Sequence, residues 1–538
     1  MSRLGALLCL AVLALASPPR AAAAPVTADD PDFPRYERLK PAIAFWTDVF
    51  GQYSEHQSVI HSSVYPGKVF EVIDLRAEAA RLDKPALARL RAEREKAAKA
   101  RIDRLLAEVH ARRGQPEQLD AEQRRVWELF RDIKGDDRYR EAIGSFRAQR
   151  GLKERTRQAL EISGKYLPEM EAIFTSYGLP VALTRLPLVE SSFNVEAYSK
   201  VGAAGLWQFM PASAKIYMRL NEVVDDRRDP WASTHGAAKH LRDDYAMLGA
   251  WPLALTAYNH GRGGVSRGLQ KTGGRTLMDL IDRYQAKSFG FASRNFYAEF
   301  LAASDVEREW RRHFGEDLQR RPLLRYETVE TRHYVPYETL RRLCGADDEL
   351  FRKLNPAYRP EVMDGKLYVP PGHLIRVPAG SAEPFSVAYA KLGDNERFSS
   401  QRVYFLQHRV SRGETLGRIA SRYGVSVKAI QSASGLKNAG SIRIGQLLKI
   451  PPREEARPGP VTVAVGESKP GLTREETRAA EQARQPVRNP RVHKVRAGQT
   501  LSSIAKQYRV SVASLRDANA LGSSSHIRAG QRLTIPAS

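Results

Sequence analysis

The chain has 538 residues, which is too long for one hydrophobic core and predicts several domains. Hydrophobic residues make up 42 % of it, the share that is usual for soluble globular proteins. The net charge of +24 favours a polyanionic partner, either nucleic acid or an anionic cell envelope. No nucleic-acid recognition motif accompanies the charge, so we expect no nucleic-acid partner.

The N-terminus has the layout of a secretory signal peptide. Arg3 precedes an apolar run at 4–16, and alanines follow at 21–24. The run is shorter than the roughly 20 residues that cross a bilayer. We therefore expect residues 1–24 to be removed and the mature chain to lack a transmembrane helix. The expected location is the periplasm or cell envelope, with peripheral membrane association at most. Cys344 then has no disulfide partner.

Two helical regions follow in chain order, at 25–165 and 166–305. The first is rich in Ala, Leu, Arg, Lys and Glu, which are strong helix formers, and it shows no group of catalytic residues. We interpret it as a helical scaffold. In the second region, Asp229 and Pro230 predict the start of a helix. Aspartate caps free backbone N–H groups, and proline fits the first helical position.

The second helical region holds three motifs suited to a sugar-binding cleft. They read E-S-S-F at 190–193, S-K-V-G-A-A-G-L-W-Q-F-M-P at 199–211 and A-Y-N-H-G at 257–261. Glu190 follows an apolar stretch, where desolvation raises the pKa of a carboxyl and makes it a proton donor near neutral pH. The two later motifs supply small, aromatic and amide residues for a cleft around this acid.

The C-terminal third of the chain contains a repeat. Residues 408–451 correspond to 493–536 at a constant offset of 85 positions (413 to 498, 445 to 530), without insertion or deletion. Each copy predicts a strand, two helices and a closing strand. We therefore expect two small modules, at 406–452 and 491–538.

Two further segments belong to this part of the chain. Residues 453–490, between the modules, are rich in Pro, Glu, Arg and Ala and are interpreted as a linker. A degenerate third copy is expected at 328–375, with strands around Val335 and Val369.

The two C-terminal copies resemble LysM modules, which bind N-acetylglucosamine-containing glycans in a shallow groove between two loops. The resemblance implies glycan strands as the partner of these modules. It implies that the groove is formed by Gly413, Glu414, Thr415, Leu416, Ile442 and Gly445 in the first copy, and by Gly498, Gln499, Thr500, Leu501, Ile527 and Gly530 in the second.

The helical motifs resemble those of lytic murein transglycosylases, and the order of parts is similar to their membrane-bound D group. The resemblance implies a mainly α fold, with a lysozyme-like α-helical catalytic domain, a helical N-terminal region and small βααβ LysM modules. It implies Glu190 as the catalytic residue. It implies that peptidoglycan glycan strands are bound by Ser199, Gln208, Met210, Tyr258, Asn259 and Tyr297.

The resemblance also implies a mechanism with one acid. Most glycoside hydrolases need two carboxylates, whereas only Glu190 lies in a motif that looks catalytic. Glu190 would protonate the bond between N-acetylmuramic acid and N-acetylglucosamine. As a carboxylate it would then take a proton from the sugar 6-hydroxyl, which closes a 1,6-anhydro ring without water. No metal-binding spacing is present in the sequence, and we expect no cofactor.

Two alternatives stay open at this point. A hydrolytic muramidase would use Asp225, Asp226 or Asp229 to activate water, although Asp229 is better explained as a helix cap. A non-catalytic wall-binding protein would depend on the LysM modules alone, through avidity.

Overall fold

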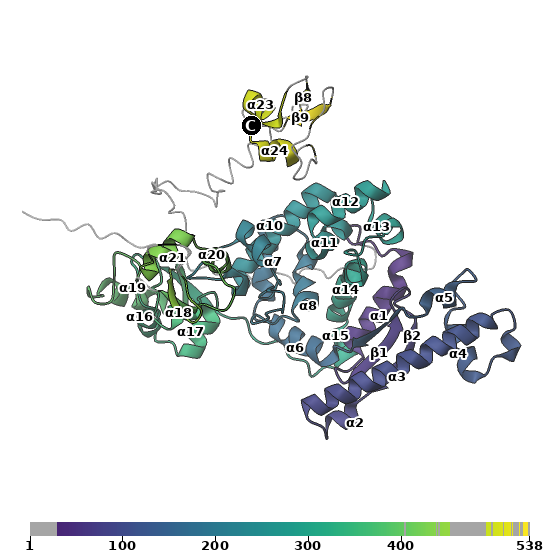
Figure 1. Ribbon diagram of the computed structural model, residues 1–538. Coiled ribbons are helices and arrows are strands. Elements are labelled where there is room, and N and C mark those ends of the chain that lie inside the picture. The colour runs from purple at the N-terminus through teal and green to yellow at the C-terminus, as the bar shows by residue number, and fades with distance from the viewer. Residues whose placement is uncertain are drawn as a thin grey trace, which may run out of the picture. The chain divides into compact units, whose positions relative to one another are not determined.

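The computed structural model describes residues 30–402, 405–436, 438 and 442–451, and parts of 491–535 (491–495, 499–508, 510–517, 519, 527 and 531–535). The predicted signal peptide at 1–24 and the predicted linker at 453–490 lie outside these residues. The chain divides into two compact units, Met1–Glu455 and Ala456–Ser538, and each is described by itself. Figure 1 shows the helices and strands of both units.

The N-terminal region combines helices with a three-stranded antiparallel sheet of order β2-β1-β3. Its elements are α1 (Lys40–Gly51), β1 (Gln57–Ser62), β2 (Val69–Asp74), α2 (Arg76–Ala79), α3 (Lys84–Ala111), α4 (Ala121–Leu129), α5 (Arg138–Ala142) and β3 (Phe146–Arg150). The long helix α3 was expected, and Asp83 caps it by accepting a hydrogen bond from the Ala86 amide. The sheet was not expected, and it adds three short strands to the helical region that the sequence predicted.

A set of helices surrounds the three motifs and shares one hydrophobic core with α1. The helices are α6 (Lys153–Ser163), α7 (Leu167–Ser176), α8 (Leu186–Glu190), α9 (Pro211–Tyr217), α10 (Pro230–Leu248), α11 (Trp251–His260), α12 (Arg262–Thr272), α13 (Leu277–Arg283), α14 (Phe291–Arg308) and α15 (Trp310–Phe314). Helix α14 lies at the centre and contacts α1, α8 and α11 (Figure 1). The start of α10 is confirmed, because Asp229 accepts hydrogen bonds from two amides of its first turn.

The next segment forms a two-stranded antiparallel sheet with helices between the strands. Its elements are β4 (Tyr326–Glu330), α16 (Tyr337–Leu343), α17 (Asp348–Leu354), α18 (Pro360–Met363), β5 (Leu374–Pro378) and α19 (Ala382–Ala390). The strands expected around Val335 and Val369 are not the ones that form the sheet. These two residues make only an isolated bridge, and the paired strands lie outside them at each end.

Both C-terminal modules have the predicted βααβ order. The first has β6 (Leu406–Arg409), α20 (Leu416–Tyr423), α21 (Val427–Ser434) and β7 (Leu447–Ile450). The second has β8 (Arg491–Lys494), α23 (Leu501–Tyr508), α24 (Val512–Asp517) and β9 (Arg532–Ile535). In each module the two strands pair antiparallel over a small apolar core. Together with the helical regions, this confirms the mainly α fold class.

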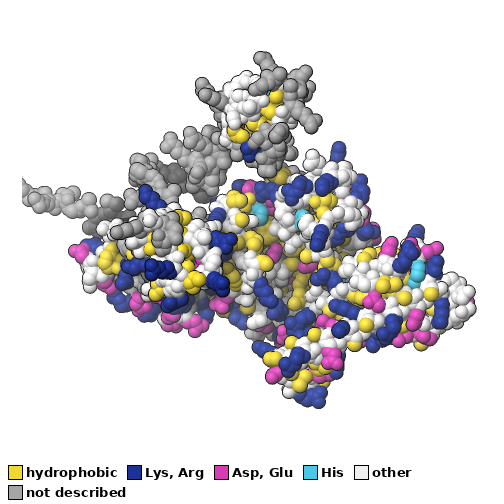
Figure 2. All heavy atoms as spheres, in the orientation of Figure 1, with side chains coloured by type: hydrophobic (Ala, Val, Ile, Leu, Met, Phe, Trp, Pro, Cys, Tyr) yellow, Lys and Arg dark blue, Asp and Glu magenta, His cyan; other side chains and the backbone are white. Residues whose placement is uncertain are grey.

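Much of the positive charge lies on solvated helices. Lys and Arg side chains intermix with Asp and Glu over α3 (Figure 2). Arg94, for example, pairs with Glu78 of α2 at 2.7 Å. Within the described part of the chain, no helix has both the length and the apolar character needed to cross a membrane.

Candidate active site

Glu190 is the last residue of the short helix α8. Leu186 and Leu188 before it are buried, whereas the Glu190 side chain is partly exposed. Burial among protein atoms raises the pKa of Glu190 to about 8, and the nearby charge of Glu299 raises it further in the same direction. The carboxyl is therefore protonated near neutral pH, as a general acid requires.

The turn that follows the acid has an unusual backbone. Ser192 and Phe193 have φ values of 53° and 54°, a left-handed conformation that residues other than glycine seldom adopt. The Phe193 ring is 1 % exposed, and its amide donates to the Pro187 carbonyl at 3.1 Å. Such backbone strain is concentrated at functional sites, where the surrounding packing must hold it. Here the buried ring holds the turn beside Glu190.

The second motif is fastened to the first. The Ser191 hydroxyl donates to the Leu206 carbonyl at 2.8 Å. Gly205 has a φ of 76°, and a Cβ there would overlap the Arg227 carbonyl oxygen, so no other residue fits this close approach. Gln208 also has a positive φ, of 47°, and its side-chain amide donates to the Gly205 carbonyl at 2.9 Å.

Arg227 holds the loop of the second motif through hydrogen bonds to its backbone. Its guanidinium donates to the carbonyls of Gly202 at 2.7 Å and Phe209 at 3.2 Å. The same group pairs with Asp225 through two hydrogen bonds of 2.8 and 2.7 Å. Arg227 thus links both ends of the glycine-rich loop to one buried carboxylate.

The third motif contributes Tyr258 from α11. Its hydroxyl donates to the Trp207 carbonyl at 2.8 Å, and its ring meets Phe209 edge-on at 5.9 Å. Burial raises the pKa of Tyr258 well above its usual value, and the charge of Glu190 acts in the same direction. Tyr258 is therefore a neutral hydroxyl close to the acid, and it brings the three motifs together in one place.

The other predicted substrate-binding residues lie in different environments. Ser199 is partly exposed, and its hydroxyl accepts a hydrogen bond from the Ala203 amide at 2.9 Å. Met210 is 42 % exposed, and Asn259 is exposed at the end of α11. Tyr297 is fully buried, and its hydroxyl donates to the Pro34 carbonyl at 3.0 Å. The structure therefore places Tyr297 in the core, where it has no surface to offer a sugar.

The three aspartates considered for a hydrolytic mechanism are buried and paired with arginines. Asp225 pairs with Arg227 as described above. Asp226 accepts from Arg219 at 3.0 Å. Asp229 caps α10 and pairs with Arg376 at 2.5 Å. Because their lone pairs are occupied by protein donors, these carboxylates are structural.

Glu299, on α14, is a residue that the sequence reasoning missed. Burial raises the pKa of Glu299 to about 8, although Arg147 of β3 lowers it. The only signal in the sequence is one acid within the apolar run F-Y-A-E-F-L-A-A at 296–303. No motif marks it, and its proximity to Glu190 depends on the packing of α8 against α14.

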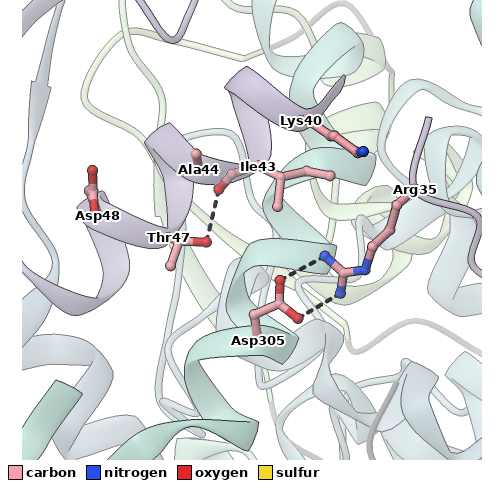
Figure 3. Close-up of a pocket in the computed structure, with 7 residues that line it drawn as sticks. All are labelled: Arg35, Lys40, Ile43, Ala44, Thr47, Asp48 and Asp305. Carbon is pink, nitrogen blue, oxygen red and sulfur yellow. Dashed lines mark hydrogen bonds and ion pairs between the residues drawn. The ribbon is translucent and has the colours of Figure 1, made fainter. Parts of the chain in front are cut away.

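An open pocket of about 370 Å³ lies elsewhere, between α1 and α14 (Figure 3). Its wall includes Arg35 and Asp305, which form two hydrogen bonds of 2.8 and 2.6 Å across the pocket. None of the motif residues lines it. We interpret it as a surface hollow where the N-terminal segment is tied to α14.

In the first LysM-like module, the predicted groove residues divide into exposed and structural ones. Gly413 and Gly445 have φ values of 80° and 83° and form the two turns. The Thr415 hydroxyl caps α20 by accepting from the Arg418 amide. Leu416 is buried, and Ile442 packs against the module core.

Glu414 is engaged inside this module. Its carboxylate accepts hydrogen bonds from the His408 ring at 2.8 Å and from the Ser411 amide at 2.9 Å. It also pairs with Arg422 at 2.8 Å. These bonds leave it a structural residue at the base of the turn.

The second module repeats this arrangement in its described residues. Gln499 bonds the His493 ring at 2.8 Å, as Glu414 bonds His408. Leu501 is buried, Ile527 packs against the core and Thr500 is exposed. Gly498 and Gly530, also predicted for this groove, lie outside the described residues.

Comparisons with known proteins agree with this division of the chain. The transglycosylase SLT domain matches residues 171–279, which include Glu190 and all three motifs but not Glu299. The LysM domain matches residues 408–451 and 493–536.

The curated proteins that are similar to the chain include the following two. The membrane-bound lytic murein transglycosylase D of Escherichia coli (strain K12) is 28 % identical over 376 residues, covering 66 % of this chain and 73 % of that protein. The putative tributyltin chloride resistance protein of Alteromonas sp. (strain M-1) is 40 % identical over 93 residues, covering 17 % of this chain and 45 % of that protein.

Solved structures of lytic transglycosylases are also similar to parts of the chain. The 70 kDa soluble lytic transglycosylase from Escherichia coli is 18 % identical, covering 51 % of both chains with a TM-score of 0.23. An inactive mutant of lytic transglycosylase Slt from Pseudomonas aeruginosa is 21 % identical, covering 28 % of this chain and 24 % of that one, also with a TM-score of 0.23.

Proposed function

We propose that the chain acts as a lytic transglycosylase in which Glu190 alone transfers the protons, an interpretation supported by the matches to the SLT domain, to two LysM domains and to a lytic murein transglycosylase. The observation that carries this proposal is a carboxyl whose burial raises its pKa to about 8, placed where three sugar-cleft motifs meet. A group with this pKa can donate a proton near neutral pH and accept one in the next step.

The reaction then balances without water. Protonated Glu190 gives its proton to the glycosidic oxygen between N-acetylmuramic acid and N-acetylglucosamine, and the bond from C1 to that oxygen breaks. The 6-hydroxyl oxygen of the muramic acid bonds to C1, and its proton passes to the Glu190 carboxylate. The products are a free 4-hydroxyl on one strand and a 1,6-anhydro end on the other. Glu190 is protonated again, so a single carboxyl completes the cycle.

We propose that the accessible motif residues hold the sugars. The partly exposed Tyr258 and Gln208 side chains lie in the loops around the acid, and Ser199 and Asn259 add polar groups at the surface. Met210, which is 42 % exposed, offers an apolar contact to a sugar face. Tyr297 is omitted from this set, because its buried ring supports α14 from within the core.

A hydrolytic muramidase fits the site less well. Hydrolysis would require a second carboxylate that is ionised at the working pH and free to activate water. Asp225, Asp226 and Asp229 are bound to arginines, and the raised pKa of Glu299 keeps that group protonated near neutral pH.

We propose that the LysM modules hold wall glycan while the catalytic region cleaves it, and that the protein works in the cell envelope. The exposed turn at Gly413 and Thr415 and the exposed Ile444, which is 68 % accessible, supply the surface in the first module. Two modules on one chain would raise the effective concentration of the substrate at the acid.

The test is digestion of purified peptidoglycan sacculi, with products identified by mass. We expect Glu190→Gln to lower the release of 1,6-anhydro products by roughly 10²–10⁴-fold, the usual contribution of a general acid–base group. Glu196→Gln is the matched control, because Glu196 is an exposed glutamate close by in the sequence. Equal activity of Glu190→Gln and wild type would refute the assignment. Binding of the inactive variant to sacculi would separate catalysis from LysM binding.

A further inference from the structure

Three acids of α14 differ in whether a cation neutralises them. Asp305 pairs with Arg35 at 2.6 Å and with Arg308 at 2.7 Å. Glu307 pairs with Arg320 at 2.5 Å. Glu299 has no hydrogen bond or ion pair to any side chain in the part of the chain that the structure describes. A carboxyl kept in a helix among apolar residues without a cation needs an explanation other than stability.

Glu299 lies on α14 about two turns before Glu307, which pairs at 3.5 Å with Arg185, the residue just before α8. Helices α8 and α14 pack together, and Glu190 and Glu299 are each partly exposed among buried neighbours. Ala298 and Phe300, on either side of Glu299, are fully buried. The charge of Glu299 raises the pKa of Glu190, and the packing of α8 against α14 brings the two residues near each other.

We propose that Glu299 is a positioning residue that keeps the proton of Glu190 in place until the glycan arrives. The proposal rests on Glu190 being the acid of the proposed function. Two neighbouring carboxyls without a bound cation cannot both ionise at low cost, so the pair retains at least one proton. A substrate oxygen that enters beside Glu190 then meets the protonated acid.

The groups around this pair favour the protonated form. From α11, Tyr258 is a neutral hydroxyl, and His260 lies beside Ser293 of α14. From β1, His61 is buried against Phe291 of α14, and burial lowers its pKa to about 4, so it is neutral. Behind Tyr258, burial likewise lowers the pKa of His240 to about 4.

Two charged groups remain near the pair. Asp244, behind Tyr258, is held by Arg262, and its pKa is raised by burial to about 6. Arg147 of β3 is exposed and stacks over the Phe291 ring at 4.4 Å, two turns of α14 before Glu299. Arg147 lowers the pKa of Glu299, but burial outweighs it. No cation among these groups binds either carboxyl directly.

The test is the pH dependence of anhydro-product release from sacculi by the full chain. Activity needs protonated Glu190, so wild type should lose activity as the pH rises through about 8. In Glu299→Gln the like charge is removed, but the burial of Glu190 remains. We therefore expect the loss of activity at high pH, the alkaline limb of the pH profile, to move to lower pH by roughly one unit, the size of interaction at which coupled carboxyls titrate as a pair. Glu299→Asp, which keeps the charge, should stay closer to wild type.

The matched control is Glu307→Gln on the same helix. It removes a paired carboxylate, so it should lower thermal stability and leave the alkaline limb unchanged. Circular dichroism and binding to sacculi check that each variant is folded. An unchanged limb in folded Glu299→Gln would overturn the proposal, as would a folded Glu299→Gln without activity at any pH, which would indicate direct participation in the chemistry. Failure of the proposed function is distinct, because Glu190→Gln would then be active.

Discussion

Two groups of carboxyls in the same helical region, one buried and one partly exposed, have opposite electrostatic environments. Asp225, Asp226 and Asp229 are each bound to an arginine, and Asp229 also caps α10. Burial raises the pKa of Glu190 and of Glu299, and neither forms an ion pair with a cation among the described residues. Burial raises the pKa of Asp226 as well, but there Arg219 opposes the effect. The difference teaches that arginines turn buried acids into structural residues, whereas their absence leaves two acids protonated near neutral pH, the state that the proposed reaction needs.

The largest stability effect is expected where a paired carboxylate loses its arginine. Arg227→Met leaves Asp225 buried and uncompensated, and it frees the carbonyls of Gly202 and Phe209. We expect the free energy of unfolding to fall by about 3–5 kcal/mol, measured by thermal or urea denaturation. Arg228→Met is the control, since Arg228 is partly exposed and bonds no carboxylate among the described residues. Equal stability of the two variants would mean that the pairing of Arg227 with Asp225 does not stabilise the fold.

The opposite sign is expected at the unpaired group. Because the pKa of Glu299 is raised to about 8, the folded protein keeps a proton that the unfolded chain releases above pH 4.5. The stability that this proton provides is fully present below pH 4.5 and is lost as the pH rises through about 8. Glu299→Gln keeps the neutral shape, so at pH 7 it should be more stable than wild type by about 1 kcal/mol.

The control for this prediction is again Glu307→Gln, which should be less stable than wild type at the same pH. Thermal denaturation at pH 5 and pH 8 measures both. A destabilised Glu299→Gln at pH 8 would mean that Glu299 is a structural acid, and the contrast between the two groups would fail.

The smallest effect is expected in the LysM modules, which repeat the contrast at their surface. Glu414 is bound by the Ser411 amide and the His408 ring, which lower its pKa, whereas Gln499 takes its place beside His493 in the second module. When folding lowers the pKa of a carboxyl, the ionised group stabilises the fold at pH values above its ordinary pKa. This stabilisation is lost as the pH falls through the pKa of the folded state. The first module should therefore loosen in acid more than the second.

Hydrogen exchange of the full chain at pH 6 and pH 4 measures this difference. We expect the β6 and β7 amides to lose protection at pH 4 in wild type. In Glu414→Gln they should show the same protection, relative to intrinsic exchange, at both values. If Glu414→Gln kept the acid sensitivity of wild type, another group would have to be responsible.

The sequence was informative where a local pattern carries the structure. The modules could be predicted from their repeat and the start of α10 from Asp229 and Pro230, while the catalytic role of Glu190 stays a prediction from its motif. It was uninformative where contacts join distant segments. The Tyr297 hydroxyl bonds Pro34, and no local pattern could place that ring in the core.

The same reason explains the other missed features. Glu299 comes near Glu190 only because α14 packs against α8, and β3 pairs with β1 across the long segment that contains β2 and α2 to α5. Glu414 lies in a turn that was expected to face a ligand, but its carboxylate is hydrogen-bonded to His408 on the preceding strand. Spacing alone does not reveal which partner a polar side chain will choose.

One measurement tests the central claim most directly, which is that Glu190 completes the cleavage without water. Sacculi are digested by the full chain in water enriched in ¹⁸O, and the muramic acid ends are weighed by mass spectrometry. We expect 1,6-anhydro ends without ¹⁸O, because the sugar's own 6-hydroxyl closes the ring. Reducing muramic acid ends that carry ¹⁸O would contradict the claim, since they would require a water molecule activated by a second base.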